Sequence, residues 1–117
     1  MKKTLLIILI TLPIALSGQS KAKKNVKATF EVSGICEMCQ KRIQKAALSV
    51  KGVKLANWDI PSHLIAVIYD SNKTSLDSLQ HTIALAGHDT PLVKAIETTY
   101  DKLPMCCLYE RMSIVKN

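Results

Sequence analysis

The chain has 117 residues, a formal charge of +7 and four cysteines, so it allows one ordinary domain and excludes a large multidomain enzyme. Hydrophobic residues make up 48% and charged residues 21%, which is enough apolar material for a small core. With one Trp, three Tyr and one Phe, a platform for stacking nucleic-acid bases is hard to assemble, and we expect no nucleic-acid partner.

The first 20 residues are typical of a secretory signal peptide. Met1 is followed by two lysines, then by an uncharged run of 13 residues from Thr4 to Leu16, and then by small or polar residues. Because a bilayer span needs roughly 20 apolar residues, we expect cleavage between about residues 17 and 20 and a mature chain that does not span the membrane. Export, in this interpretation to the periplasm, lets disulfides persist.

A lead-in at residues 21–25 precedes the first structural patterns. Residues 26–32 alternate apolar and polar side chains, as a half-buried strand does, and Gly34 ends the pattern. From Cys39 onward, apolar residues at helical spacing predict an amphipathic helix that ends near Gly52. Its other face is basic and polar: Lys41, Arg42, Gln44 and Lys45. We interpret this face as solvated, with contact to an acidic partner as the alternative.

A hairpin and a second helix are predicted next. Residues 53–60 and 64–70 are strand-like, and the short turn between them predicts an antiparallel pair. Thr74 or Ser75 can cap a second helix, which Gly87 ends. The apolar face of this helix is Leu76, Leu79, Ile83 and Ala86.

The last part of the chain carries a weaker pattern. Residues 90–96 are consistent with a final short strand, and residues 98–117 form a C-terminal extension that contains Cys106 and Cys107. A domain at residues 26–97 then has the order βαββαβ. This order predicts an α+β ferredoxin-like fold, with two helices on one face of an antiparallel sheet.

The tetrapeptide Cys36-Glu37-Met38-Cys39 lies between the first predicted strand and the first predicted helix. Two thiols three positions apart can converge on one atom, and the positive end of a helix favours the thiolate. Because thiolates select Cu(I) and other thiophilic ions, the spacing predicts a soft-metal site at Cys36 and Cys39. Two alternatives stay open. One is a structural disulfide, and the other is a thiol–disulfide oxidoreductase in which Thr90-Pro91 imitates the cis-proline that faces such a site.

Several stretches between Val26 and Ala95 carry a family resemblance: Val32 to Cys39 with Ile43 and Ala46, Lys51 to Asp59, Ala66 to Asp70, and Ala86-Gly87. They are similar to the heavy-metal-associated domain. This is the family of small copper chaperones, periplasmic mercury-binding proteins and the amino-terminal modules of metal-transporting ATPases. The resemblance implies a ferredoxin-like βαββαβ fold and a metal ion held by Cys36 and Cys39.

The metal loop departs from the pattern of that family. Family members usually read Gly-Met-x-Cys-x-x-Cys, whereas Ile35 alone separates Gly34 from Cys36. We expect Ile35 or Met38 to make the core contact of the missing methionine. The alternative for Met38 is a thioether contact to Cu(I).

The extension is the second departure, because Cys106 and Cys107 lie beyond the usual end of such a domain. Adjacent cysteines rarely bridge each other, so each can add a thiolate to the metal site or form a disulfide with Cys36 or Cys39. If the extension folds back over the CxxC loop, the site should hold its ion more tightly and exchange it more slowly. Tetrahedral Zn(II) then competes with Cu(I).

The remaining polar candidates are three histidines and one carboxylate. The resemblance places His88 beside the metal loop, as a ligand or a hydrogen-bond donor to a thiolate, with a solvated loop residue as the alternative. We expect His63 at the opposite end of the sheet and exposed, and His81 on a helix surface. Glu37 is expected to stabilise the helix start rather than to bind the ion.

Together these features predict an exported soft-metal binding protein, either a copper chaperone or scavenger or a mercury-binding protein. It passes its ion on by exchange between thiolates and catalyses nothing. Cu(I) is the first expectation for the ion, and Hg(II), Zn(II) and Cd(II) are the alternatives. The expected partner is a membrane metal transporter or another metal-binding domain.

Overall fold

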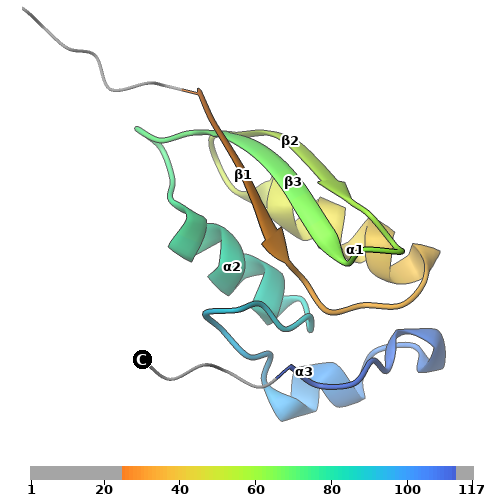
Figure 1. The fold of residues 1–117 in the computed structure, drawn as a ribbon. Coiled ribbons are helices and arrows are strands. Elements are labelled where there is room, and N and C mark those ends of the chain that lie inside the picture. Colours follow the sequence, from red (N-terminus) through yellow and green to blue (C-terminus); the bar gives the residue numbers. More distant parts are fainter. Residues whose placement is uncertain (1–24, 113–117) are drawn as a thin grey trace, which may run out of the picture.

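The computed structural model describes residues 25–112. In chain order the elements are β1 (Asn25–Glu31), α1 (Glu37–Ser49), β2 (Val53–Trp58), β3 (Leu64–Asp70), α2 (Leu76–Leu85), α3 (Glu97–Asp101) and the 3-10 helix η1 (Met105–Cys107). Figure 1 shows α3 and η1 as a blue run of chain that passes the end of α2 and reaches toward the start of α1.

The predicted signal peptide and the lead-in up to residue 24 lie outside the described residues. Asn25, which the sequence placed in the lead-in, is already the first residue of β1 and lies opposite Asp70. Within residues 25–112, no helix has both the length and the apolar character that a membrane crossing requires.

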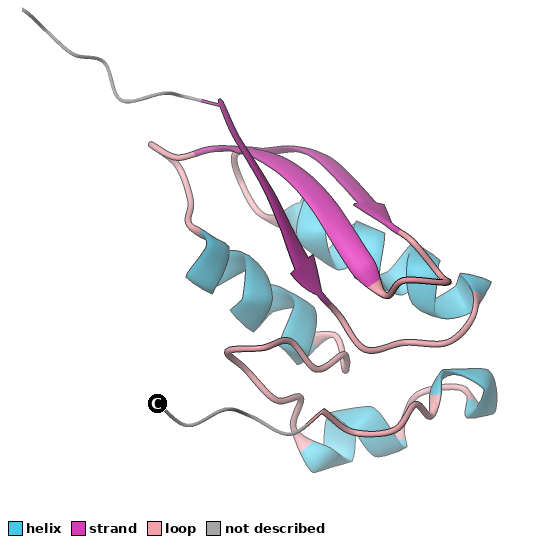
Figure 2. Ribbon diagram, in the orientation of Figure 1, coloured by secondary structure: helices cyan, strands magenta, loops and turns pink. Residues whose placement is uncertain are grey.

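The strands form one antiparallel sheet in the order β1-β3-β2, so β3 is central (Figure 2). Ala28 of β1 and Ala56 of β2 both lie opposite Val67 of β3. Alternate strand residues point into a single core that both longer helices share. This core includes Phe30, Trp58, Ile65, Val67 and Tyr69 from the strands and Cys39, Ile43, Leu79 and Ile83 from the helices. The α+β fold class predicted from the sequence is therefore confirmed.

The final strand predicted at residues 90–96 is wrong, because none of these residues is in a strand. Their polar groups have other partners. Thr90 closes a turn in which its backbone N–H donates to the Val93 carbonyl at 2.9 Å. The Asp89 carboxylate accepts from the Ala95 N–H at 2.8 Å. A turn held partly by side chains therefore replaces the predicted strand and its hydrogen bonds to a neighbouring strand. In the described part of the chain, β1 pairs with β3 alone.

Two glutamines join α1 to the last residue of β2. Gln40 Nε2 donates to Trp58 O at 2.7 Å, and Trp58 N donates to Gln44 Oε1 at 3.0 Å. Lys41 and Lys45 are exposed. The prediction of a solvated basic face thus holds for these lysines, whereas Arg42 is half-buried and donates to Cys107 Sγ at 3.4 Å.

Trp58 supports the loop between β1 and α1. Its side chain is fully buried, and its Nε1–H donates to the Val32 carbonyl at 3.0 Å. A Cβ atom on Gly34 would lie 3.0 Å from Trp58 Cη2, so the loop rests directly on the indole. Ile35 and Met38 are 49% and 50% exposed. The prediction that one of them makes the core contact of the missing methionine is therefore wrong.

Helix α2 begins and ends as predicted. Ser78 N donates to Ser75 Oγ at 3.2 Å, which caps the first turn. Gly87 follows the helix with φ of +108°, a left-handed conformation that glycine adopts without strain. A Cβ atom there would lie 2.9 Å from Leu103 Cδ2. The C-terminal segment therefore packs against the turn that ends α2.

Candidate metal centre

The two cysteines of the CxxC motif lie at the start of α1. Cys36 is the N-cap residue, with an extended backbone, and its carbonyl accepts the first helical hydrogen bond from Gln40 N at 3.0 Å. Its Sγ lies 3.5 Å from Cys39 Sγ. Cys36 is half-buried and Cys39 is fully buried, so Cys36 is the more accessible of the two thiols. Glu37 is exposed in the first turn, where its charge complements the helix dipole as predicted.

The C-terminal segment brings two more thiols to Cys36. Cys36 Sγ lies 3.0 Å from Cys106 Sγ and 3.6 Å from Cys107 Sγ, and the tail sulfurs are 3.9 Å apart. The Met38 thioether lies 3.5 Å from Cys106 Sγ. Among the described residues, Cys36, Cys106 and Cys107 form a group of metal-ligand atoms that all lie within 4.8 Å of one another. The extension therefore folds back over the CxxC loop, one of the two arrangements left open by the sequence.

The thiols differ in their affinity for a proton. The pKa of Cys36 is lowered to about 6, chiefly because Cys106 donates a hydrogen bond to its sulfur. The same hydrogen bond raises the pKa of Cys106, because the Cys106 thiol is its donor. Burial is the main cause that raises the pKa of Cys107, although Arg42 Nη1 donates to its Sγ at 3.4 Å. In the metal-free protein at neutral pH, Cys36 is therefore largely a thiolate, whereas Cys106 and Cys107 keep their protons.

This difference predicts selective alkylation. In the reduced, metal-free protein, iodoacetamide should label Cys36 first, and the labelling rate should rise to half its plateau near pH 6. Peptide mapping by mass spectrometry identifies the site. Cys106→Ala removes the hydrogen-bond donor and should move the half-plateau point to higher pH. Equal labelling of Cys36 and Cys106 at pH 7 would contradict the assignment.

His88 is neither solvated nor part of the sulfur cluster. It is fully buried, its Nδ1 lies 2.8 Å from the Ser33 carbonyl, and its ring stacks on Tyr109 with centroids 5.5 Å apart. Burial is the main reason that its pKa falls from 6.5 to about 4. The ring nitrogen Nε2 has no hydrogen-bond partner among the described residues. Through its contact with the Ser33 carbonyl, His88 therefore supports the loop that contains Gly34.

Of the other two histidines, one lies where the sequence predicted and one does not. His63 was expected at the far end of the sheet, but β3 starts opposite the end of β1, and Val32 N donates to the His63 carbonyl at 2.8 Å. Since antiparallel β3 begins where β1 ends, His63 lies at the same end as the cysteine loop. It is half-buried and stacks on Trp58, with ring centroids 5.7 Å apart. His81 is exposed on α2, as predicted.

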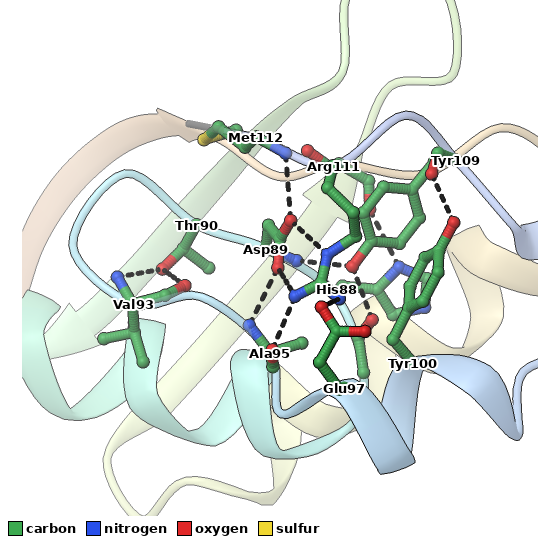
Figure 3. A network of polar contacts seen from close by, with 12 residues as sticks. His88, Asp89, Thr90, Val93, Ala95, Glu97, Tyr100, Tyr109, Arg111 and Met112 are labelled. Carbon is green, nitrogen blue, oxygen red and sulfur yellow. Dashed lines mark hydrogen bonds and ion pairs between the residues drawn. The ribbon is translucent and has the colours of Figure 1, made fainter. Parts of the chain in front are cut away.

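Sequence reasoning missed the polar network that fastens the extension to the domain (Figure 3). Arg111 Nε donates to Asp89 Oδ2 at 2.8 Å, and Arg111 Nη2 donates to Asp89 Oδ1 at 2.9 Å. Tyr109 Oη donates to the Gly87 carbonyl at 2.6 Å and accepts from Asp89 N at 2.9 Å. Tyr100 Oη donates to the Tyr109 carbonyl at 2.5 Å. No local pattern marks these residues, because Asp89 and Arg111 are 22 positions apart.

Comparison with known proteins agrees with this fold. The sequence matches the heavy-metal-associated domain over residues 29–89, just over half of the chain, and the chain therefore belongs to that family. The copper chaperone CopZ of Staphylococcus haemolyticus is 26% identical over 65 residues, which cover 55% of this chain and 96% of that protein.

Solved structures show the same relationship. One is the N-terminal domain of a potential copper-translocating P-type ATPase from Bacillus subtilis in the Cu(I)-loaded state. It is 25% identical, with a TM-score of 0.54 over 56% of this chain and 84% of that one. A CopZ metallochaperone structure has 23% identity and a TM-score of 0.54, over 56% of this chain and 98% of its own, and so shares the fold. The family match includes Cys36 and Cys39 and ends before Cys106 and Cys107.

The oxidoreductase alternative gains no support from the loop after α2. Within residues 25–112 no peptide bond is cis, so Pro91 does not have the geometry that this alternative assumed.

Proposed function

We propose that this protein carries a soft heavy-metal ion, with Cu(I) as its cargo, and passes the ion on by exchange between thiolates. The observation that carries the proposal is the pair of thiols at the start of α1, 3.5 Å apart, of which Cys36 is accessible and has a pKa of about 6. A thiolate at that pKa is available as a metal ligand at neutral pH. Cys36 receives or releases the ion first, and the buried Cys39 holds it.

Copper is proposed over the other thiophilic ions because the donors are soft. All four nearby ligand atoms are thiol sulfurs, and thiolates favour Cu(I). The similarity to a copper chaperone and to a domain solved with Cu(I) supports the same ion. Hg(II), Zn(II) and Cd(II) also accept thiolates and are the competitors to test. Ligand exchange of this kind needs no catalytic group.

We also propose that the protein is exported, on the basis of the signal-like residues 1–20. Its partner is a membrane metal transporter or another metal-binding domain, to which the exposed Lys41 and Lys45 present positive charge. Mass spectrometry of the protein recovered from its own cell tests export: the chain should lack about its first 17–20 residues. An intact Met1 terminus would contradict export without affecting the metal proposal.

The metal proposal is tested by titrating Cu(I) into the reduced protein under anaerobic conditions against a competing chelator. The wild type should bind one ion tightly, and the double variant Cys36→Ser/Cys39→Ser should lose this binding. Glu37→Gln, a change between the two cysteines at an exposed oxygen ligand, is the control and should bind like the wild type. Failure of the wild type to compete with the chelator would overturn the proposal.

A further inference from the structure

The arrangement of sulfurs at Cys36 goes beyond a two-thiolate site. Cys36 Sγ is close to a thiol of the CxxC motif and to a thiol of the C-terminal segment. It lies 3.5 Å from Cys39 Sγ and 3.0 Å from Cys106 Sγ. Cys107 lies 3.6 Å from it. One ion bound at about 2.3 Å from each of several thiolates separates neighbouring sulfurs by about 3.8 Å. The observed separations of 3.0, 3.6 and 3.9 Å among Cys36, Cys106 and Cys107 therefore need only small side-chain adjustments around a bound ion.

The two tail cysteines are held in this position from both sides. Before them, Leu103 packs on Gly87 and is 9% exposed. After them, Tyr109 is buried and hydrogen-bonded to the Gly87 carbonyl, and Arg111 is paired with the buried Asp89. The short helix η1 between these anchors contacts α1. The tail thiols are thus fixed beside the metal loop before any ion arrives, which lowers the entropy cost of using them as ligands.

The surroundings of the tail thiols also suit a bound ion. Arg42 Nη1 lies 3.4 Å from Cys107 Sγ and can stabilise the negative charge of that sulfur after the ion displaces its proton. Cys106 is exposed, so it is open to incoming ions and to an accepting partner. The Met38 thioether, 3.5 Å from Cys106 Sγ, adds a soft donor at the rim of the cluster.

We propose that Cys106 and Cys107 bind the same ion as Cys36, so that the C-terminal segment closes a site of at least three thiolates over the CxxC loop. This inference rests on the proposed function and changes its expected kinetics. A closed thiolate site holds its ion more tightly and releases it more slowly than an open pair. Release then requires a partner that first displaces the exposed Cys106.

The test compares the reduced wild type with Cys106→Ser and with Cys106→Ser/Cys107→Ala, using Cu(I) as the probe under anaerobic conditions. Three quantities are measured: affinity against a competing chelator, the rate of Cu(I) release to it, and the number of sulfur ligands from X-ray absorption. Both variants should still bind one ion. Their affinity should fall by more than the roughly 10-fold that even the loss of an outer-shell partner costs. Their release should be faster, and the double variant should have two sulfur ligands where the wild type has at least three.

The control is Met105→Ser, because Met105 is a sulfur-containing residue of the same 3-10 turn and is 89% exposed. It should behave like the wild type. Cys106 is exposed, so its single variant tests the proposal even if the change at buried Cys107 disturbs folding. Unchanged affinity, release rate and sulfur number in Cys106→Ser would overturn the inference and leave the proposed function intact. Absence of Cu(I) binding by the wild type would overturn both.

Discussion

Replacing Asp89 with alanine should lower the free energy of unfolding by about 3–5 kcal/mol, the largest effect of any single substitution proposed for this protein. The Asp89 side chain is fully buried and accepts hydrogen bonds from Arg111, from Ala95 N and from Met112 N. Arg111 is itself 16% exposed, so Asp89→Ala leaves a largely buried guanidinium without its main partner. Urea unfolding of the reduced, metal-free protein measures the loss.

The matched control is Glu97→Ala, which removes another carboxylate from the same guanidinium. Glu97 Oε1 lies 3.6 Å from Arg111 Nη1, but the Glu97 side chain is 75% exposed, and exposed pairs contribute less than about 1 kcal/mol. Hydrogen exchange of the backbone after residue 103 should also accelerate in Asp89→Ala, because the tail loses its anchor. Equal, small losses in the two variants would show that the buried pair does not fasten the extension.

Lowering the pH from 6.5 to 4 should destabilise the protein by about 3 kcal/mol through His88 alone. Its pKa falls from 6.5 to about 4, chiefly because the ring is buried, and Arg42 lowers it further. The Ser33 carbonyl and the Asp89 carboxylate act in the opposite direction, and the uncharged Tyr109 ring stacks on it. The folded state keeps His88 neutral while the unfolded chain takes up a proton below pH 6.5. Stability is therefore present above pH 6.5 and lost as the pH falls toward 4.

Unfolding free energies of the wild type and of His88→Asn, measured from pH 7 to pH 4, isolate this contribution. Asparagine can still donate to the Ser33 carbonyl and does not titrate in this range, so the variant should lose less stability over the same interval. Asp89, whose pKa is lowered from 3.8, acts below this interval and leaves the difference unaffected. Parallel pH profiles for the two proteins would contradict a neutral, buried His88.

Most of the fold followed from local patterns. The apolar spacing from Cys39, the cap at Ser75 and the left-handed Gly87 depend on neighbours within a turn or two, so α1, α2 and the hairpin could be predicted, whereas α3 and η1 were not. The absence of a strand at residues 90–96 could not be predicted from local patterns. In this segment the Ala95 N–H donates to the Asp89 carboxylate, and the Thr90 N–H donates to the Val93 carbonyl within a turn. Hydrophobic periodicity does not indicate either contact.

The placement of His63 at the far end of the sheet was an error of topology that the predicted element order already contradicts. Because β1 and β2 are both antiparallel to β3, the turn between β2 and β3 lies at the same end of the sheet as the loop after β1. The support of the Gly34 loop by Trp58 depends on the tertiary structure, because the two residues are 24 positions apart in the chain.

By itself, the sequence determined a single small α+β domain with two cysteines at the start of a helix, because spacing and helix polarity are properties of a few adjacent residues. Only the tertiary structure decided the role of the four cysteines as a group. Cys36 and Cys106 are 70 positions apart, and their 3.0 Å contact exists because Asp89, Arg111 and Tyr109 hold the tail against the loop after α2. Such closure depends on buried pairs between segments that are far apart in the chain, and no local pattern encodes their proximity.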